Sequence, residues 1–100
     1  MRMMLKAHLE VQVANIAMSD GSVEKTIGEV MQYCKPEAAY FCTEGGRRTI
    51  YAVFDLAEPS DIVVLAEPLF QNLGAEVEFI PVMVQADLQK GAGIWMSRRS

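Results

Sequence analysis

The stretch Thr43-Glu44-Gly45-Gly46-Arg47-Arg48-Thr49, TEGGRRT, separates two segments rich in β-branched and aromatic residues, 37–43 and 47–56. Two adjacent glycines suit a two-residue hairpin loop, in which both loop positions need a positive φ. The competing interpretation is a phosphate-binding loop made of glycine amides and arginines. Such a loop opens a helix, whereas this stretch leads into a strand. The stretch therefore predicts a β-hairpin.

The hairpin loop fixes which residues of the two strands face each other, because cross-strand partners are counted outward from the turn. The predicted pairs are Glu44 with Arg47, Thr43 with Arg48, Cys42 with Thr49, Phe41 with Ile50, and Tyr40 with Tyr51. One face carries apolar residues that suit a position beneath helices: Ala39, Phe41, Ile50, Ala52, Phe54 and Leu56. The other face has a mixed character: Tyr40, Cys42, Thr49, Tyr51, Val53 and Asp55.

An N-terminal strand is predicted from Met3 to Val13, where apolar and polar side chains alternate. Lys6, His8 and Glu10 lie on the polar side of this pattern. The segment 14–21, ANIAMSDG, ends in a Ser-Asp-Gly group that breaks regular structure. We therefore expect a connection there, with at most one short turn of helix.

Two helices are predicted from apolar residues at helical spacing. The first ends before Pro36, and its stripe consists of Val23, Ile27, Val30, Met31 and Cys34. The second begins near Ser60 and ends at Gly74, and its stripe consists of Ile62, Leu65, Ala66, Leu69, Phe70 and Leu73. Pro68 lies inside the second helix and lacks an amide donor, so a kink or a break is expected there.

The last strand is predicted from Glu76 to Val84, and Pro81 places it at a sheet edge. The order of elements is then β-α-β-β-α-β, the ferredoxin-like motif. This is an α+β fold with a four-stranded antiparallel sheet and both helices on one face. We expect one domain over residues 1–86 and a C-terminal arm or short helix over 87–100, which carries Trp95.

Composition excludes several classes of partner. The chain has 51% hydrophobic and 22% charged residues, as a globular domain does. Its formal net charge of −4 disfavours a nucleic-acid partner, because nucleic-acid affinity depends on neutralising phosphates. The longest apolar run, 62–66, is too short to cross a bilayer, and Lys6 and His8 interrupt any signal-peptide pattern. No membrane partner and a cytoplasmic location are expected.

The cysteines and the single histidine leave no closed zinc site. Cys34 and Cys42 lack the C-x-x-C spacing, and His8 is the only histidine. We expect no metal and no cofactor.

The candidate site is the helix-free face of the predicted sheet. It combines side chains from all four strands: Lys6, His8, Tyr40, Tyr51, Asp55 and Glu78. Two interpretations remain open. Either a second subunit covers this face and closes a ligand cavity, or tyrosines and a histidine lie half-exposed on an open sheet.

His8 is the candidate catalytic acid or base, because its side chain titrates near neutral pH. Lys6 and Glu10, each two residues away on the same strand face, are close enough to orient the ring. Tyr40 and Tyr51 would donate hydrogen bonds to a ligand oxygen, and Asp55 or Glu78 would assist as a base. Taken singly, each of these residues also has a purely structural explanation, as a packed or solvated side chain.

Several phrases resemble a family of small bacterial proteins in the dimeric α+β barrel superfamily. They are LKAHLE, KPEAAYF, GRRT, VFDL, PSDI, AEPLF, AEVEFIPVM and ADLQKG, and they span most of residues 1–90. The resemblance implies that two ferredoxin-like sheets face each other and form a barrel. Better-known members are muconolactone isomerases, cofactor-free monooxygenases and haem-degrading or chlorite-handling enzymes. Their active residues do not map onto this chain.

Two hypotheses about function follow. The first is a homodimer that binds a small aromatic or oxygenated organic ligand on the helix-free face, with cofactor-free acid/base chemistry through His8 if it is an enzyme. The second is a non-catalytic protein whose helix-free face is only a dimer interface.

Overall fold

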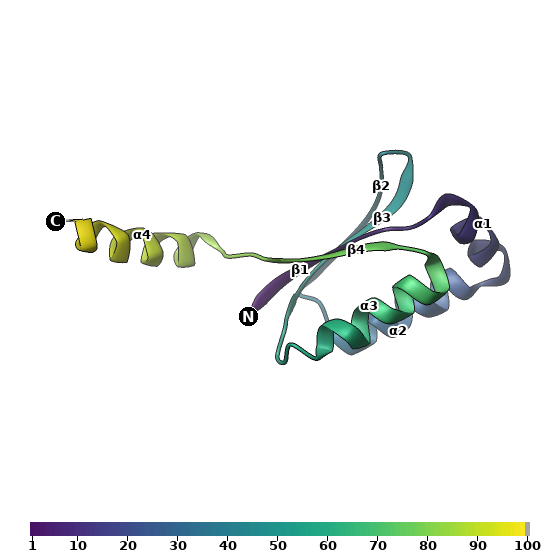
Figure 1. Cartoon of the computed structure of the whole chain (residues 1–100), viewed down its shortest axis with the longest axis horizontal. Coiled ribbons are helices and arrows are strands. Elements are labelled where there is room, and N and C mark those ends of the chain that lie inside the picture. The colour runs from purple at the N-terminus through teal and green to yellow at the C-terminus, as the bar shows by residue number, and fades with distance from the viewer. Residues whose placement is uncertain (100) are drawn as a thin grey trace.

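The structure is a computed structural model that describes residues 1–99. It is an α+β fold with one antiparallel sheet in the order β2-β3-β1-β4. The strands are β1 (Arg2–His8), β2 (Ala38–Glu44), β3 (Arg47–Asp55) and β4 (Glu76–Pro81). The helices are α1 (Val11–Asp20), α2 (Ser22–Cys34), α3 (Asp61–Leu73) and α4 (Gln85–Arg99). α2 and α3 lie side by side on one face of the sheet, and α4 extends away from it (Figure 1).

The β2–β3 hairpin has the predicted turn and register. Gly45 and Gly46 adopt φ values of 61° and 77°, so both loop positions are left-handed, as a two-residue hairpin requires. Glu44 pairs with Arg47, and the other four predicted pairs follow in the same register. The faces of the two strands are therefore those that the sequence predicts.

Strand β1 lies in the interior of the sheet, between β3 and β4. Strand β4 is at an edge, as Pro81 indicates, and it ends at Pro81 rather than at Val84. A single backbone hydrogen bond continues beyond it, from the Val82 amide to the Arg2 carbonyl at 3.2 Å.

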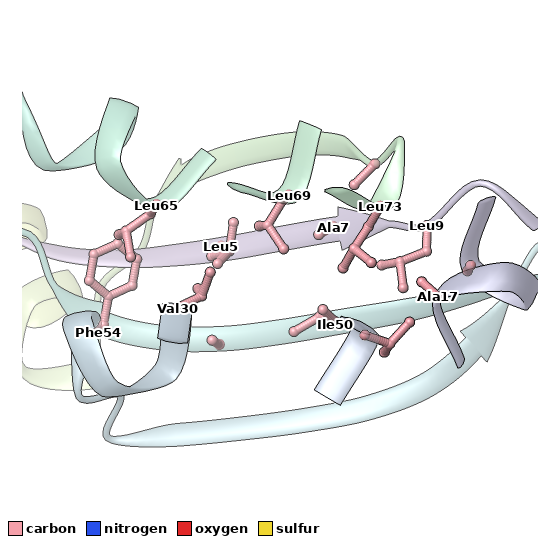
Figure 2. Packing of buried hydrophobic residues seen from close by; sticks show 14 of the residues in the cluster. Leu5, Ala7, Leu9, Ala17, Val30, Ile50, Phe54, Leu65, Leu69 and Leu73 are labelled. Atoms are coloured by element: carbon pink, nitrogen blue, oxygen red, sulfur yellow. The ribbon is translucent and has the colours of Figure 1, made fainter. Parts of the chain in front are cut away.

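The hydrophobic core lies between the sheet and the pair α2 and α3. Side chains of β1 and β3 pack against leucines of α3 and Val30 of α2 (Figure 2). Alternate residues of β1 are buried, because successive side chains of a strand point to opposite faces. All residues of the first predicted stripe belong to this core or pack against it, as do Leu65, Leu69 and Leu73 of the second, whereas Ile62 is half-buried outside it and Phe70 is 44% exposed.

Phe41 is also an exception to the predicted core. Its register places it on the helix-covered face opposite Ile50, yet it is 59% exposed. Strand β2 is the other edge of the sheet, and the helices do not extend far enough to bury its side chains. Phe41 instead lines a groove with Met18 and Ile27.

The prediction of a strand up to Val13, followed by a connection, is wrong. Strand β1 ends at His8, and helix α1 starts at Val11. The Glu10 carboxylate caps this helix by accepting a hydrogen bond from the Val13 amide at 2.7 Å. Ala14 and Ala17 are buried one turn apart, so the segment has a helical face that its alternating apolar residues obscure.

Helix α3 continues through Pro68 without a break, so a broken helix is not observed. The C-terminal helix begins at Gln85, two residues before Asp87, and its 15 residues make it longer than the short helix expected. The elements thus include two helices beyond the predicted β-α-β-β-α-β order, α1 and α4. None of the helices within residues 1–99 combines the length and apolar character needed to cross a membrane.

Candidate functional site

On the helix-free face of the sheet, side chains of paired residues in β3, β1 and β4 lie side by side across the strands. His8 of β1 pairs with Thr49 of β3 on one side and with Glu76 of β4 on the other. One step along the strand, Lys6 pairs with Tyr51 and with Glu78 in the same way. The strand register therefore brings basic, acidic and phenolic groups together on one surface.

Glu44, at the end of β2, is the central acceptor of this surface. Its Oε2 atom lies 3.2 Å from Lys6 Nζ and 3.3 Å from His8 Nε2. Its Oε1 atom accepts a hydrogen bond from the Tyr51 hydroxyl. Lys6 Nζ also lies 5.6 Å from the centre of the Tyr51 ring. Three side chains from β1 and β3 thus converge on a single carboxylate.

His8 is held at its second nitrogen by Thr49. The two atoms His8 Nδ1 and Thr49 Oγ1 are 2.8 Å apart, and the Thr49 hydroxyl donates to the Arg47 carbonyl at 3.1 Å. Because that hydroxyl has one proton, Thr49 accepts from the Nδ1–H of the ring. The Nε2 atom then faces the Glu44 carboxylate and donates to it only when the ring is doubly protonated. We name Lys6, His8, Glu44, Thr49 and Tyr51 the β-face cluster.

The electrostatics of the β-face cluster follow from these contacts. The hydrogen bond from Tyr51, followed by that from Lys6, lowers the pKa of Glu44 below its ordinary value. The hydrogen bond to Glu44 raises the pKa of Tyr51, and burial adds to this shift. The same carboxylate raises the pKa of Lys6. At neutral pH the cluster therefore contains an ionised Glu44, a neutral Tyr51 and a charged Lys6.

The side chains of the β-face cluster differ in their access to solvent. The exposed fraction is 11% for His8, 24% for Lys6 and 44% for Glu44, and Thr49 is buried. Of these four side chains, Glu44 is the most accessible to a molecule that approaches this face, and its Oε2 atom lies 3.3 Å from His8 Nε2. Proton exchange between such a molecule and His8 would pass through the Glu44 carboxylate.

The structure brings some of the predicted site residues together and separates others. Lys6, His8 and Tyr51 belong to the β-face cluster. Tyr40 lies on the same face opposite Tyr51 and is 68% exposed, and Glu78 is an exposed neighbour of Lys6. Asp55 lies at the far end of β3, where it pairs with the N-terminal ammonium group at 2.8 Å.

Sequence reasoning did not name Glu44 or Thr49 as candidate site residues, although it placed Thr49 on this face. The predicted hairpin pairs Glu44 with Arg47, and this register is correct. The Glu44 side chain nevertheless turns toward β1, while Arg47 Nη1 pairs with Glu76 Oε1 at 3.0 Å. The signal for Glu44 lay in the alternation of β2, which puts Tyr40 and Glu44 on one face. That Glu44 reaches Lys6 and His8 depends also on β1 lying next to β3 in the sheet.

The other reactive groups singled out in the sequence have structural partners or unfavourable environments. Arg47 is paired with Glu76, and Arg48 Nη2 donates to Asn15 Oδ1 at 3.1 Å. Partial burial raises the pKa of the Cys34 thiol, which weakens it as a nucleophile. Within residues 1–99, no three His, Cys, Asp or Glu side chains are grouped so that they would hold a metal ion.

No model of a known protein family matches the chain. A search of the curated proteins also finds no match.

Proposed function

We propose that this chain forms a homodimer that binds a small organic ligand on the helix-free face, at the β-face cluster. The observation that carries the proposal is the convergence of Lys6, His8 and Tyr51 on Glu44 from three strands, on a face without a helical cover. A second sheet packed over this face would exclude water from the cluster and enclose a cavity for the ligand. The corresponding architecture is a pair of ferredoxin-like sheets in a dimeric α+β barrel.

The chemistry of the β-face cluster favours an oxygenated ligand. The Lys6 ammonium group is a donor for a carbonyl, hydroxyl or carboxylate oxygen, and the Tyr51 hydroxyl, whose proton goes to Glu44, offers its oxygen as an acceptor. Tyr40, exposed in the next position across the hairpin, offers a ring for an aromatic ligand to stack on. We therefore propose an aromatic or otherwise oxygenated small molecule as the ligand class.

If the site is catalytic, His8 and Glu44 act together in proton transfer. Glu44 would take a proton from an acidic C–H or O–H of the ligand, and His8, held by Thr49, would stabilise or relay it. Lys6 would stabilise the negative charge that develops on the ligand oxygen. This chemistry uses side chains alone and needs no cofactor. The two free thiols, Cys34 and Cys42, would suit a reducing compartment such as the cytoplasm.

The second candidate is a non-catalytic dimer interface. It is favoured by one observation, which is that the groups of the β-face cluster satisfy one another. Among residues 1–99, no buried side-chain nitrogen or oxygen lacks a hydrogen-bond partner. A closed network of this kind is also what a structural ion-pair cluster shows.

Sedimentation equilibrium over a range of concentrations tests the dimer. We expect about twice the chain mass of 11.1 kDa for the natural sequence. Tyr40→Asp, on the exposed helix-free face, should shift the equilibrium toward monomer by at least tenfold. Gln32→Asp, on the exposed side of α2, is the matched control and should have no effect. A natural chain that stays monomeric at high concentration contradicts the enclosed site.

Amide chemical shifts test ligand binding, with a panel of hydroxylated aromatic acids as probes. We expect shifts at the β-face cluster that Glu44→Gln weakens, and exchange of a ligand C–H proton for deuterium that His8→Gln abolishes. Shifts without exchange would support a binding protein. If a stable dimer shows no shifts and no exchange, the helix-free face is only a dimer interface.

A further inference from the structure

Helix α4 projects from the folded body and buries none of its residues. Four of its apolar side chains, Leu88, Ile94, Trp95 and Met96, are between 46% and 59% exposed. The radius of gyration is 16.4 Å, and the long axis measures 60 Å. A compact domain of this length has a radius of gyration of about 13 Å. The excess comes from α4 and its connection to β4 (Figure 1).

A helix in this position needs a packing partner. Helices of about 12–15 residues are marginally stable in water by themselves, and packing of an amphipathic face normally supplies the missing stability. Gly91 and Gly93, in the middle of α4, each cost about 1 kcal/mol relative to alanine. The helix therefore has the length and composition of a segment that forms against another surface.

One side of α4 is suited to such packing. Leu88, Ala92, Trp95 and Met96 follow the spacing i, i+4, i+7 and i+8, which gathers them into one stripe. Arg99 continues this side, and its guanidinium group lies 4.7 Å from the centre of the Trp95 ring. Tryptophan and arginine are the residues most enriched at the centres of protein interfaces.

The body offers a groove of matching character between α3 and the edge strand β4. Its volume is about 350 Å³, and Ile62, Val63, Phe70 and Phe79 line it together with Glu67. Val63 is 61% exposed and Phe70 is 44% exposed, although both are large apolar side chains. The groove is therefore an unfilled apolar surface with a carboxylate at its side.

Charge distinguishes this groove from the apolar groove beside β2. Residues 85–100 contain three basic residues and one acidic residue, a formal charge of +2, which leaves −6 on residues 1–84 of a chain with −4 in total. Segment 57–73, which includes α3, has three carboxylates and no basic residue. The groove beside β2 has Arg48 in its lining, which would repel the basic helix.

The helix does not occupy this groove in its own chain. Only residues 82–84 connect β4 to α4, and the Val82 amide is bonded to the Arg2 carbonyl, in line with β4. The Asp87 carboxylate accepts a hydrogen bond from the Val84 amide at 3.2 Å and lies 4.0 Å from Arg2 Nη1. These contacts direct α4 away from α3 (Figure 1).

We propose that α4 of one copy docks in the α3–β4 groove of a second copy, with Trp95 in the groove and Arg98 or Arg99 near Glu67. The exchange is reciprocal, as an interface with two-fold symmetry requires. The proposal needs a second copy, as the proposed function does, but it uses a different surface and does not depend on the chemistry of the β-face cluster. It assigns the arm a partner: another molecule of the same chain.

The first test is sedimentation equilibrium of the full chain with matched substitutions in α4. Trp95→Ala should weaken self-association at least tenfold, whereas Ile94→Ala, on the opposite side of the helix, should change it less than twofold. Glu67→Lys should weaken association, and the combination with Arg98→Glu and Arg99→Glu should restore it. Equal effects of Trp95→Ala and Ile94→Ala, or no effect of Trp95→Ala, would overturn the proposal.

The second test locates the helix. A nitroxide label at Met96→Cys, in an unenriched chain with Cys34→Ala and Cys42→Ser, is mixed with ¹⁵N-enriched natural chain. We expect broadened amide signals at Val63 and Phe70 of the enriched copy. Broadening around Phe41, or none, contradicts docking on α3. The same experiment is repeated with Tyr40→Asp in both chains. Broadening that persists there would show that α4 still docks when the sheets no longer pair.

Discussion

The Glu44 carboxylate is contacted by Lys6, His8 and Tyr51. Protonating it is therefore harder than protonating an ordinary half-exposed carboxylate. The fold of the hairpin places it there, because it is the last residue of β2 before the two glycines. Its side chain then has β3 and β1 within reach on the helix-free face. A single residue thus connects the turn, the sheet and the candidate site.

The lowered pKa of Glu44 predicts a pH dependence of stability with a definite sign. Below about pH 4.3, the ordinary value for Glu, the unfolded chain binds a proton that the folded chain resists. The stabilisation is thus complete above this pH and is lost as the pH falls through the lower folded-state pKa. Glu44→Gln should reduce the free energy of unfolding at pH 7, and the difference from the natural chain should shrink toward pH 3.

Urea unfolding at pH 7, 5, 4 and 3 measures this difference. Glu29→Gln, on the exposed side of α2, is the control and should retain the pH dependence of the natural chain. A difference between Glu44→Gln and the natural chain that stays constant over this range would show that the contacts of Glu44 do not favour its charged form.

At the scale of elements, the β2–β3 hairpin depends on the left-handed conformation of Gly45, whose φ is 61°. No atom lies within 4 Å of the position that a Cβ would take there, so the backbone conformation alone determines the effect of substitution. Gly45→Val should reduce the free energy of unfolding by about 1–2 kcal/mol, because a β-branched residue resists this region.

Gly45→Asn is the matched control, since Asn-Gly is a preferred pair in a two-residue hairpin loop. It should lie within about 0.5 kcal/mol of the natural chain. Thermal or urea unfolding measures both variants. If valine and asparagine have the same effect, the turn conformation is not what stabilises the hairpin.

The sequence predicts an element well where its signal is local. The Gly-Gly turn defines the hairpin register, and Pro36 and Gly74 end the two central helices close to where they are predicted. The N-terminal error has a physical cause: Val11 and Val13 fit a strand by alternation, but the Glu10 cap and the buried face of Ala14 favour a helix. The alternation of apolar and polar residues, which predicts a strand, does not indicate that Ala14 is buried against the rest of the fold.

The candidate site was predictable only in part for the same reason. Lys6, His8 and Tyr51 follow from alternation along single strands. The turn of the Glu44 side chain toward β1, and the Thr49 contact with His8, depend on β1 lying beside β3, although His8 and Thr49 are 41 residues apart in the chain. Pro68 shows the opposite case, since packing of α3 on the core maintains a helix that a local rule would break.

At the scale of the whole molecule, the folded body and α4 should contribute separately to stability. Because α4 buries none of its residues on its own body, a chain that ends at Val84 should unfold with a free energy within about 1 kcal/mol of the full chain. The comparison applies at a concentration where both are monomeric. Its urea m-value should also be nearly unchanged, since little additional surface is exposed.

Urea unfolding followed by circular dichroism measures both quantities. Leu69→Ala in α3, where the side chain is fully buried, is the positive control and should cost about 2–5 kcal/mol. A loss of more than 2 kcal/mol on removal of residues 85–100 would mean that α4 stabilises its own body directly.

The separation of formal charge between the basic C-terminal helix and the acidic body gives the molecule an electric dipole moment along its 60 Å axis. When two such molecules lie side by side, their dipoles attract in the antiparallel orientation, which is compatible with a two-fold axis. Screening over about 8–10 Å at physiological ionic strength would weaken this alignment. The rate at which two copies associate should therefore fall steeply as salt is added, while short-range apolar contacts largely determine how long they remain together.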